Sequence, residues 1–195
     1  MSSKPVLPSE AYVSVDVETS GPNPGTYSML SIGACLVSDP QRGFYVELQP
    51  LNSNAIPGAL AISDLSMEAL AEHGLPPARA LARFEAWLEA EIPSDQRPVF
   101  VALNAPFDWM FVNDYFHRFL ERNPFGHSAL DIKAFYMGLT GIRWARTSMK
   151  YLARRYLAGR KLTHNALRDA QDQAELFAKI LAEAEAQSRK LKVEG

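Results

Sequence analysis

Two acidic side chains occupy alternate positions in a segment whose pattern predicts a half-buried β-strand. Residues 12–19 run Tyr-Val-Ser-Val-Asp-Val-Glu-Thr, so that valines alternate with polar residues. Because successive side chains of a strand point to opposite faces, the valines would face a core, and Asp16 and Glu18 would project together from the other face. Carboxylates about 7 Å apart along a strand repel each other unless a cation lies between them, and Mg²⁺ is commonly bound by one or two carboxylates. Two solvated acids on an exposed face are the alternative interpretation.

A third acid follows a continuous apolar run. Residues 98–103 have the length of a strand and predict one that is buried on both faces, and residues 104–106, Asn-Ala-Pro, signal a helix start. Asp108 would therefore lie in the first turn of a helix, just beyond the carboxyl end of a central strand. Ligand sites of open α/β sheets lie at such positions. A carboxylate there also suits the helix dipole, so Asp108 alone could be only a helix-stabilising acid.

A histidine and a fourth acid flank the start of the last predicted helix. Asn165 is a suitable N-cap, which places His164 in the preceding loop and Asp169 in the first turns. Asp172 is a competing acid three positions on, about 300° around the helix. In that loop His164 would be free to move. The other histidines have no acids grouped around them: His73, His117 and His127.

The elements that must position these groups begin with three strands. The pattern predicts strands over 11–18, 29–37 and 44–48, separated by a dense turn signal at 20–25 and a hairpin turn at 39–43. Such short connections join antiparallel neighbours.

The rest of the chain predicts helices interrupted by two strands. Helices on both sides of the apolar strand at 98–103 indicate a parallel crossover. The expected elements are a short helix ending near Gly74, a helix from Pro76 or Pro77 to before Pro93, a helix from Asn104 to about Asn123, an edge strand at 129–132, helical segments at 133–138 and 147–158, and a last helix from near Asn165 to about Gln187.

Composition predicts one globular domain in a reducing compartment. The chain has 195 residues, a net charge of −2 and a single cysteine, Cys35, which excludes an internal disulfide. We expect a flexible arm over 1–10, one folded domain over 11–187 and a frayed tail over 188–195. The N-terminus has no apolar region of a secretory signal, and no run approaches the roughly 18 apolar residues of a membrane helix. A cytoplasmic protein without membrane contact is therefore expected.

The small net charge hides a basic block. No acidic residue stands between Asp131 and Asp169, and the nine lysines and arginines of that interval leave a charge of −11 for the rest of the chain. One interpretation is a solvated helix face whose long side chains cover apolar surface. The other is a surface for a phosphate backbone.

Three short motifs, in this order, resemble those of the DnaQ-like, DEDDh-type 3′→5′ exonucleases. They are Asp16-x-Glu18-Thr19, Asn104-Ala105-x-Phe107-Asp108 and His164-x-Ala166-x-x-Asp169, and the resemblance covers about residues 11–178. It implies an α/β, ribonuclease-H-like fold, with a five-stranded mixed sheet of three antiparallel strands followed by two parallel ones, flanked by helices.

The resemblance also implies the catalytic roles. Asp16, Glu18, Asp108 and Asp169 would be ligands of two divalent cations, Mg²⁺ or Mn²⁺, and His164 would be the general base. Two positions depart from many relatives, which have a histidine where Leu103 stands and an acid where Ser31 stands. Neither belongs to the catalytic set, so these departures concern substrate preference.

The sequence thus predicts a metal-dependent 3′→5′ exonuclease that acts on single-stranded DNA or RNA 3′ ends. The alternatives are a ribonuclease-T-like or oligoribonuclease-like exoribonuclease, a catalytically silent nucleic-acid-binding module and a structural domain with incidental acids. A homodimer and a polymerase partner are open possibilities, although the chain ends soon after the last helix and lacks a long flexible tail. The predicted substrate-binding residues are Thr19, Phe107, Trp109, Arg143, Arg146, Lys150, Arg154 and Arg155.

Overall fold

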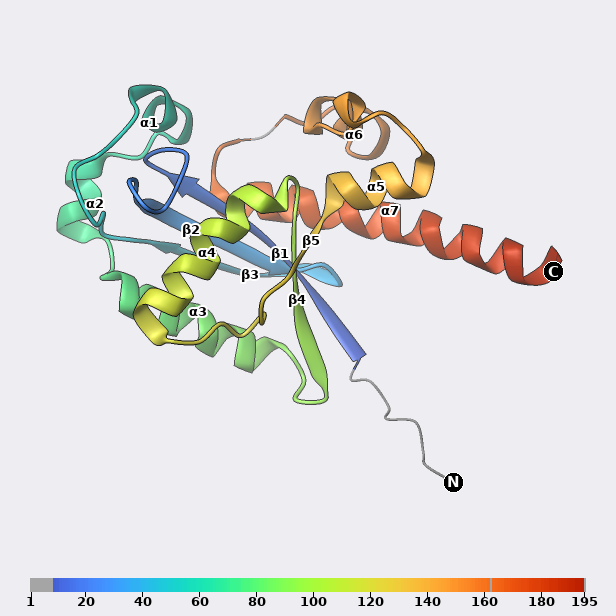
Figure 1. Cartoon of the computed structure of the whole chain (residues 1–195), viewed down its shortest axis with the longest axis horizontal. Helices are drawn as coiled ribbons and strands as arrows, with labels where there is room; N and C mark the ends of the chain where they lie inside the picture. Colours follow the sequence, from blue (N-terminus) through green and yellow to red (C-terminus); the bar gives the residue numbers. More distant parts are fainter. Residues whose placement is uncertain (1–8, 162, 195) are drawn as a thin grey trace.

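A five-stranded mixed sheet forms the centre of the computed structural model, which describes residues 9–161 and 163–194 (Figure 1). The strands are β1 (Ser9–Thr19), β2 (Met29–Leu36), β3 (Asp39–Glu47), β4 (Gln96–Ala102) and β5 (Ala129–Asp131). Their order is β3-β2-β1-β4-β5, with β1 to β3 antiparallel and β4 and β5 parallel to β1. The predicted fold class is confirmed.

Helices cover both faces of this sheet. They are α1 (Pro57–Ser63), α2 (Met67–His73), α3 (Pro77–Glu91), α4 (Ala105–Leu120), α5 (Ile132–Thr140), the 3₁₀ turn η1 (Trp144–Arg146), α6 (Met149–Tyr156) and α7 (Ala166–Glu194). Figure 1 shows α3 and α4 on one side and α5, α6 and α7 on the other. Within the described ranges, no helix is long and apolar enough to cross a membrane.

The alternation in β1 separates a core face from the face that carries the acids. Val13, Val15 and Val17 are buried in the cluster that includes Phe84 of α3 and Phe111 of α4. A second apolar cluster lies between the opposite face of the sheet and α5 to α7. Asp16 and Glu18 belong to this opposite face, as the alternation predicts.

The start of α7 lies directly against β2. A Cβ atom on Gly33 would lie 2.1 Å from backbone atoms of Ala166 and Leu167, so only glycine permits this approach. Gly33 is also the strand neighbour of Asp16. The first turns of α7, which carry Asp169, are therefore held beside the strand position that carries Asp16.

The predicted hairpin turn at 39–43 is wrong. The turn occupies Val37 and Ser38, and Asp39 already begins β3. The pairing shifts between Cys35 and Leu36, which forms an irregularity that accommodates the residues from Pro40 to Arg42. Proline lacks the N–H of a ladder bond, and it is tolerated here because β3 is an edge strand.

The other differences concern the ends of elements and one helix that the sequence did not predict. Ser9 and Glu10, predicted to lie in a flexible arm, pair with β4 as part of β1, and residues 1–8 lie outside the described residues. Helix α7 continues to Glu194 beyond the expected end at Gln187, because its last turns hold good helix formers and an i,i+4 pair of Glu185 and Arg189. Helix α1, which begins on Pro57, was not predicted.

Candidate active site

Asp16 and Glu18 lie on the part of β1 that extends beyond its pairing with β4. That pairing ends at Ser14 and Val101. The Asp16 carboxylate accepts a hydrogen bond at Oδ1 from the amide Nε2 of Gln173 on α7, at 2.6 Å. The two acids are therefore on a strand end that is open on one edge and covered by α7 on one face.

Asp108 joins them from the first turn of α4. Its side chain is 5% exposed, and its Oδ1 accepts the backbone N–H of Val17 at 3.1 Å. This N–H lies between Asp16 and Glu18 in β1, past the last residue paired with β4. Asp108 thus satisfies a strand donor that has no β4 partner, and the same bond places its carboxylate beside the two acids of β1.

Asp169 is buried and organises the loop that carries the histidine. It is 2% exposed, and its two oxygens accept the Thr163 N–H at 2.8 Å, the Thr163 hydroxyl at 3.0 Å and the His164 N–H at 2.9 Å. Asn165 caps α7, with its Oδ1 accepting the Arg168 N–H at 3.2 Å. His164 adopts a left-handed backbone with φ 55°, a conformation that histidine takes more readily than most residues.

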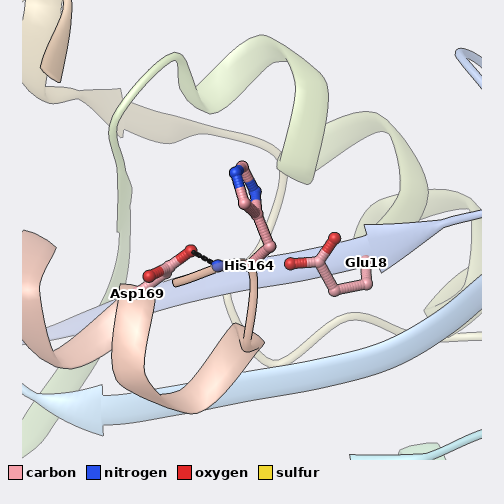
Figure 2. Close-up of side chains that lie close together, drawn as sticks. All are labelled: Glu18, His164 and Asp169. Atoms are coloured by element: carbon pink, nitrogen blue, oxygen red, sulfur yellow. Dashed lines mark hydrogen bonds between the residues drawn. The ribbon is translucent and has the colours of Figure 1, made fainter. Parts of the chain in front are cut away.

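The side chain of His164 projects from this loop beside two of the acids. Figure 2 shows the imidazole standing clear of its own backbone, with Glu18 and Asp169 on either side. Ligating atoms of Glu18, His164 and Asp169 lie within 4.8 Å of one another. His164 is exposed, so this imidazole can reach a molecule that enters the site from solvent.

Burial and mutual repulsion raise the pKa values of three carboxyls. Burial raises the pKa of Asp108 to about 8, against its hydrogen bond from Val17. The pKa of Glu18 rises to about 7, because of burial and then the charge of Asp169. Burial, followed by the charges of Asp108, Glu18 and Asp169, raises the pKa of Asp16 well above its usual range. The four acids therefore lie close enough together that their negative charges are unfavourable unless protons or cations neutralise them.

This donor set fits divalent cations. Hard cations such as Mg²⁺ take oxygen ligands, and four carboxylates supply them without a compensating lysine or arginine among their hydrogen-bond partners in the described residues. Asp172, the competing acid, is not part of the cluster, since it binds Arg160 at 2.5 Å. Asp169, and not Asp172, thus completes the set.

Comparison with known proteins identifies the family. The family model of the Rv2179c-like 3′-5′ exoribonuclease domain matches residues 11–181. The chain belongs to this exonuclease family. It is also 46% identical over 171 residues to the 3′-5′ DNA exonuclease Cap18 of Escherichia coli, covering 88% of this chain and 91% of that protein. It is 33% identical over 186 residues to ribonuclease T of Shewanella denitrificans, covering 87% and 79% respectively.

Solved structures share the fold of this exonuclease. The nuclease domain of 3′hExo, a DEDDh family member bound to rAMP, aligns with a TM-score of 0.73 at 12% identity, over 90% of this chain and 93% of that one. E. coli exonuclease I in complex with an oligonucleotide aligns with a TM-score of 0.64 at 15% identity, over 86% of this chain and 40% of that one. The protein is a 3′→5′ exonuclease, and so a hydrolase, with the fold of the DEDDh exonucleases. Exonucleases of this type use divalent metals.

The predicted substrate-binding residues near the motifs are largely packed into the exonuclease core. Thr19 is buried, and its hydroxyl donates to the Gly21 carbonyl at 2.9 Å. Phe107 packs on Phe111, with ring centroids 5.6 Å apart, and Trp109 lies edge-on to Phe100 at 5.2 Å. Phe107 and Trp109 are partly buried, so each keeps only part of its ring toward solvent.

The predicted basic residues lie in three different settings. Lys150 and Arg154 line a hollow of about 520 Å³ that His164 also lines. Arg143 directly precedes η1, Arg146 is the last residue of η1, and both are exposed. Arg155 instead contacts Glu183 at 3.1 Å and the Tyr136 hydroxyl at 3.3 Å, which directs it toward α7 and α5.

The sequence interpretation missed Gln173, which lies beside the site, and Trp144 in the basic interval. Gln173 contacts Asp16, and its position four residues after Asp169 on the same helix face is a signal that could have found it. Trp144 is 49% exposed within the basic interval, with the Lys133 ammonium 4.2 Å from its ring centroid. Exposed tryptophan between basic residues is typical of single-strand binding surfaces.

Without metal, the exonuclease should lose stability as pH rises. The folded state holds protons on Glu18 and Asp108 that the unfolded chain releases, because their pKa values of about 7 and about 8 exceed the ordinary value of about 4. This contribution is fully present below about pH 4 and is lost as pH rises to about 8. Saturation with Mn²⁺ at 100 times its dissociation constant should then add about 2.7 kcal/mol to the free energy of unfolding.

Thermal melts of the wild type and Asp16→Asn at pH 5.5 and pH 8, in EDTA or Mn²⁺, measure this. Asparagine keeps an acceptor for Gln173 and removes one charge. The variant should melt at or above the wild type in EDTA at pH 8, and should lose most of the gain from Mn²⁺. If it melts well below the wild type in EDTA, Asp16 stabilises the fold and is not part of a repulsive functional cluster.

Proposed function

We propose that this exonuclease removes nucleotides one at a time from the 3′ ends of single-stranded DNA, with two divalent cations, Mg²⁺ or Mn²⁺, held by Asp16, Glu18, Asp108 and Asp169. The observation that carries the proposal is the convergence of these four carboxylates with an exposed histidine. The similarity to a DNA exonuclease at 46% identity favours DNA.

A second candidate is an exoribonuclease acting on RNA 3′ ends. The family description and the 33% identity to ribonuclease T favour it. A cytoplasmic location is a sequence prediction that we carry forward with either candidate, and a homodimer and a polymerase partner stay open possibilities.

The side chains of the site have separate roles in phosphodiester hydrolysis. Paired divalent cations, when bound, stabilise charge on the attacking and leaving oxygens of an in-line displacement. Asp108 and Asp169 are fixed by backbone donors, which keeps their oxygens in place without substrate. His164 accepts the proton of the attacking water, and its place in a loop lets it approach when a strand end is bound.

The basic surface beside the site is suited to the phosphates of the entering strand. Lys150 and Arg154 line the hollow next to His164, and no ion pair is found for either within the described part of the chain. Arg143, Arg146 and the exposed ring of Trp144 lie close in sequence, at the start of η1 and within it. Basic groups alternating with an aromatic ring bind single strands through phosphates and stacked bases.

Neutralising this surface should change the salt dependence of binding. The double variant Lys150→Gln, Arg154→Gln should bind a single-stranded oligonucleotide with a log–log salt slope that is shallower by about 0.7 for each phosphate that the variant no longer neutralises. Fluorescence anisotropy with a labelled oligonucleotide between low and moderate salt measures it. Arg122→Gln is the matched control, because Arg122 binds Glu85 of α3 away from the site. An unchanged slope in the double variant would mean that Lys150 and Arg154 are solvated and contact no phosphate.

Digestion of end-labelled oligonucleotides tests the proposed function. Single- and double-stranded DNA and RNA of one sequence are incubated with Mg²⁺ or Mn²⁺, and the products are resolved by length. Stepwise loss of mononucleotides from single-stranded DNA 3′ ends is expected. Faster digestion of RNA would favour the second candidate, and internal cuts alone, or digestion unaffected by EDTA, would contradict both.

A further inference from the structure

Gln173 carries a buried amide whose two polar atoms are both hydrogen-bonded, one of them to the acid cluster. Its side chain is 2% exposed and lies on α7 one turn beyond Asp169. The Oε1 atom accepts the backbone N–H of Leu103 at 2.7 Å, and Nε2 donates to Asp16 Oδ1 at 2.6 Å. A buried amide with both ends bonded is held in one orientation.

The Leu103 contact determines which end of the amide meets Asp16. A backbone N–H can only donate, so the atom facing it must be the carbonyl oxygen of Gln173. The NH₂ group must then face Asp16, whose carboxylate can only accept when ionised. Leu103 directly follows β4, so Gln173 joins the ends of β4 and β1 to α7 at the acid cluster.

We propose that Gln173 is a positioning residue that fixes the Asp16 carboxylate for cation binding. This inference rests on the proposed function. The donated hydrogen bond uses one lone pair of Oδ1 and restricts the rotation of the side chain, and the remaining lone pairs of the carboxylate stay available to a cation. A glutamine does this without adding charge to four acids, whereas a lysine at this position would compete with the cation for the same carboxylate.

A purely structural role makes a different prediction. If Gln173 only ties α7 to the residue after β4, its loss lowers the stability of the fold and leaves the affinity for metal unchanged. If it positions Asp16, its loss weakens metal binding even where the fold persists. Loss of a group that hydrogen-bonds to a metal ligand commonly lowers metal affinity or activity by about 10- to 100-fold.

Calorimetric titration with Mn²⁺ alone separates these roles. Gln173→Met preserves length and removes both hydrogen bonds, and it should bind Mn²⁺ about 10- to 100-fold more weakly than the wild type. Its kcat on an oligonucleotide should fall with little change in KM. Gln171→Met is the matched control, because Gln171 lies on the same helix and donates to the Pro40 carbonyl at 2.9 Å, away from Asp16. The control should bind Mn²⁺ as the wild type does.

A second variant keeps the proposal testable if Gln173→Met does not fold. Gln173→Asn keeps an amide that is one methylene too short to span from Leu103 to Asp16, and it should also weaken Mn²⁺ binding, while circular dichroism verifies the fold. Mn²⁺ affinity within twofold of the wild type in a folded variant at position 173 would overturn the proposal. Failure of the proposed function is distinguishable, because a wild type that binds Mn²⁺ and digests no nucleic acid would contradict the function alone.

Discussion

Asp108→Asn is expected to lose nearly all exonuclease activity while keeping the fold. The asparagine oxygen can still accept the Val17 N–H that Asp108 Oδ1 accepts at 3.1 Å, so α4 should stay attached to β1. The substitution removes one of four negative charges that would hold the cations. Release of mononucleotides from a 3′-labelled single strand should fall to the level of the wild type in excess EDTA.

A neighbouring acid provides the control for this result. Asp172 lies on α7 close to Asp169 but binds Arg160, so Asp172→Asn changes the local charge without removing a member of the cluster. This variant should keep activity within a fewfold of the wild type. Substantial activity in Asp108→Asn, or an equal loss in both variants, would contradict the assignment of Asp108 to the metal site.

The acid cluster could be predicted because local pattern places each member. Alternation in β1 determines the face of Asp16 and Glu18, and the position of Asp108 follows from a proline-marked helix start after a buried strand. Asp169 follows from an N-cap at Asn165. The order of the three motifs along the chain then implied the sheet that brings these ends together.

The parts that escaped prediction depend on contacts between distant segments. Gln173 meets Asp16 and Leu103 only after α7 has packed across two strands, and Gly33 permits that packing through its missing Cβ. The early hairpin turn depends on a register shift at Cys35, which local turn propensities do not encode. The different settings of the basic residues likewise depend on α7. Glu183 of α7 binds Arg155, whereas Lys150 and Arg154 line the hollow beside His164.

His164→Ala is expected to lower the rate by roughly 10²- to 10⁴-fold, the usual contribution of general acid–base catalysis. The loop should persist, because the backbone N–H of His164, and not its imidazole, donates to Asp169 at 2.9 Å. The left-handed backbone at φ 55° is less favourable for alanine. His164→Asn is therefore the matched variant, since asparagine tolerates this conformation and supplies no comparable base.

Metal affinity decides which role the imidazole has. Its position within 4.8 Å of ligating atoms of Glu18 and Asp169 would also suit a cation ligand. A base that acts on water can be removed without loss of cations, because the four carboxylates retain the ligating charge. Single-turnover cleavage should therefore slow in both variants while calorimetry with Mn²⁺ gives the wild-type affinity. A tenfold or greater loss of Mn²⁺ affinity in both would instead make His164 a ligand, and the proton of the attacking water would then need another acceptor.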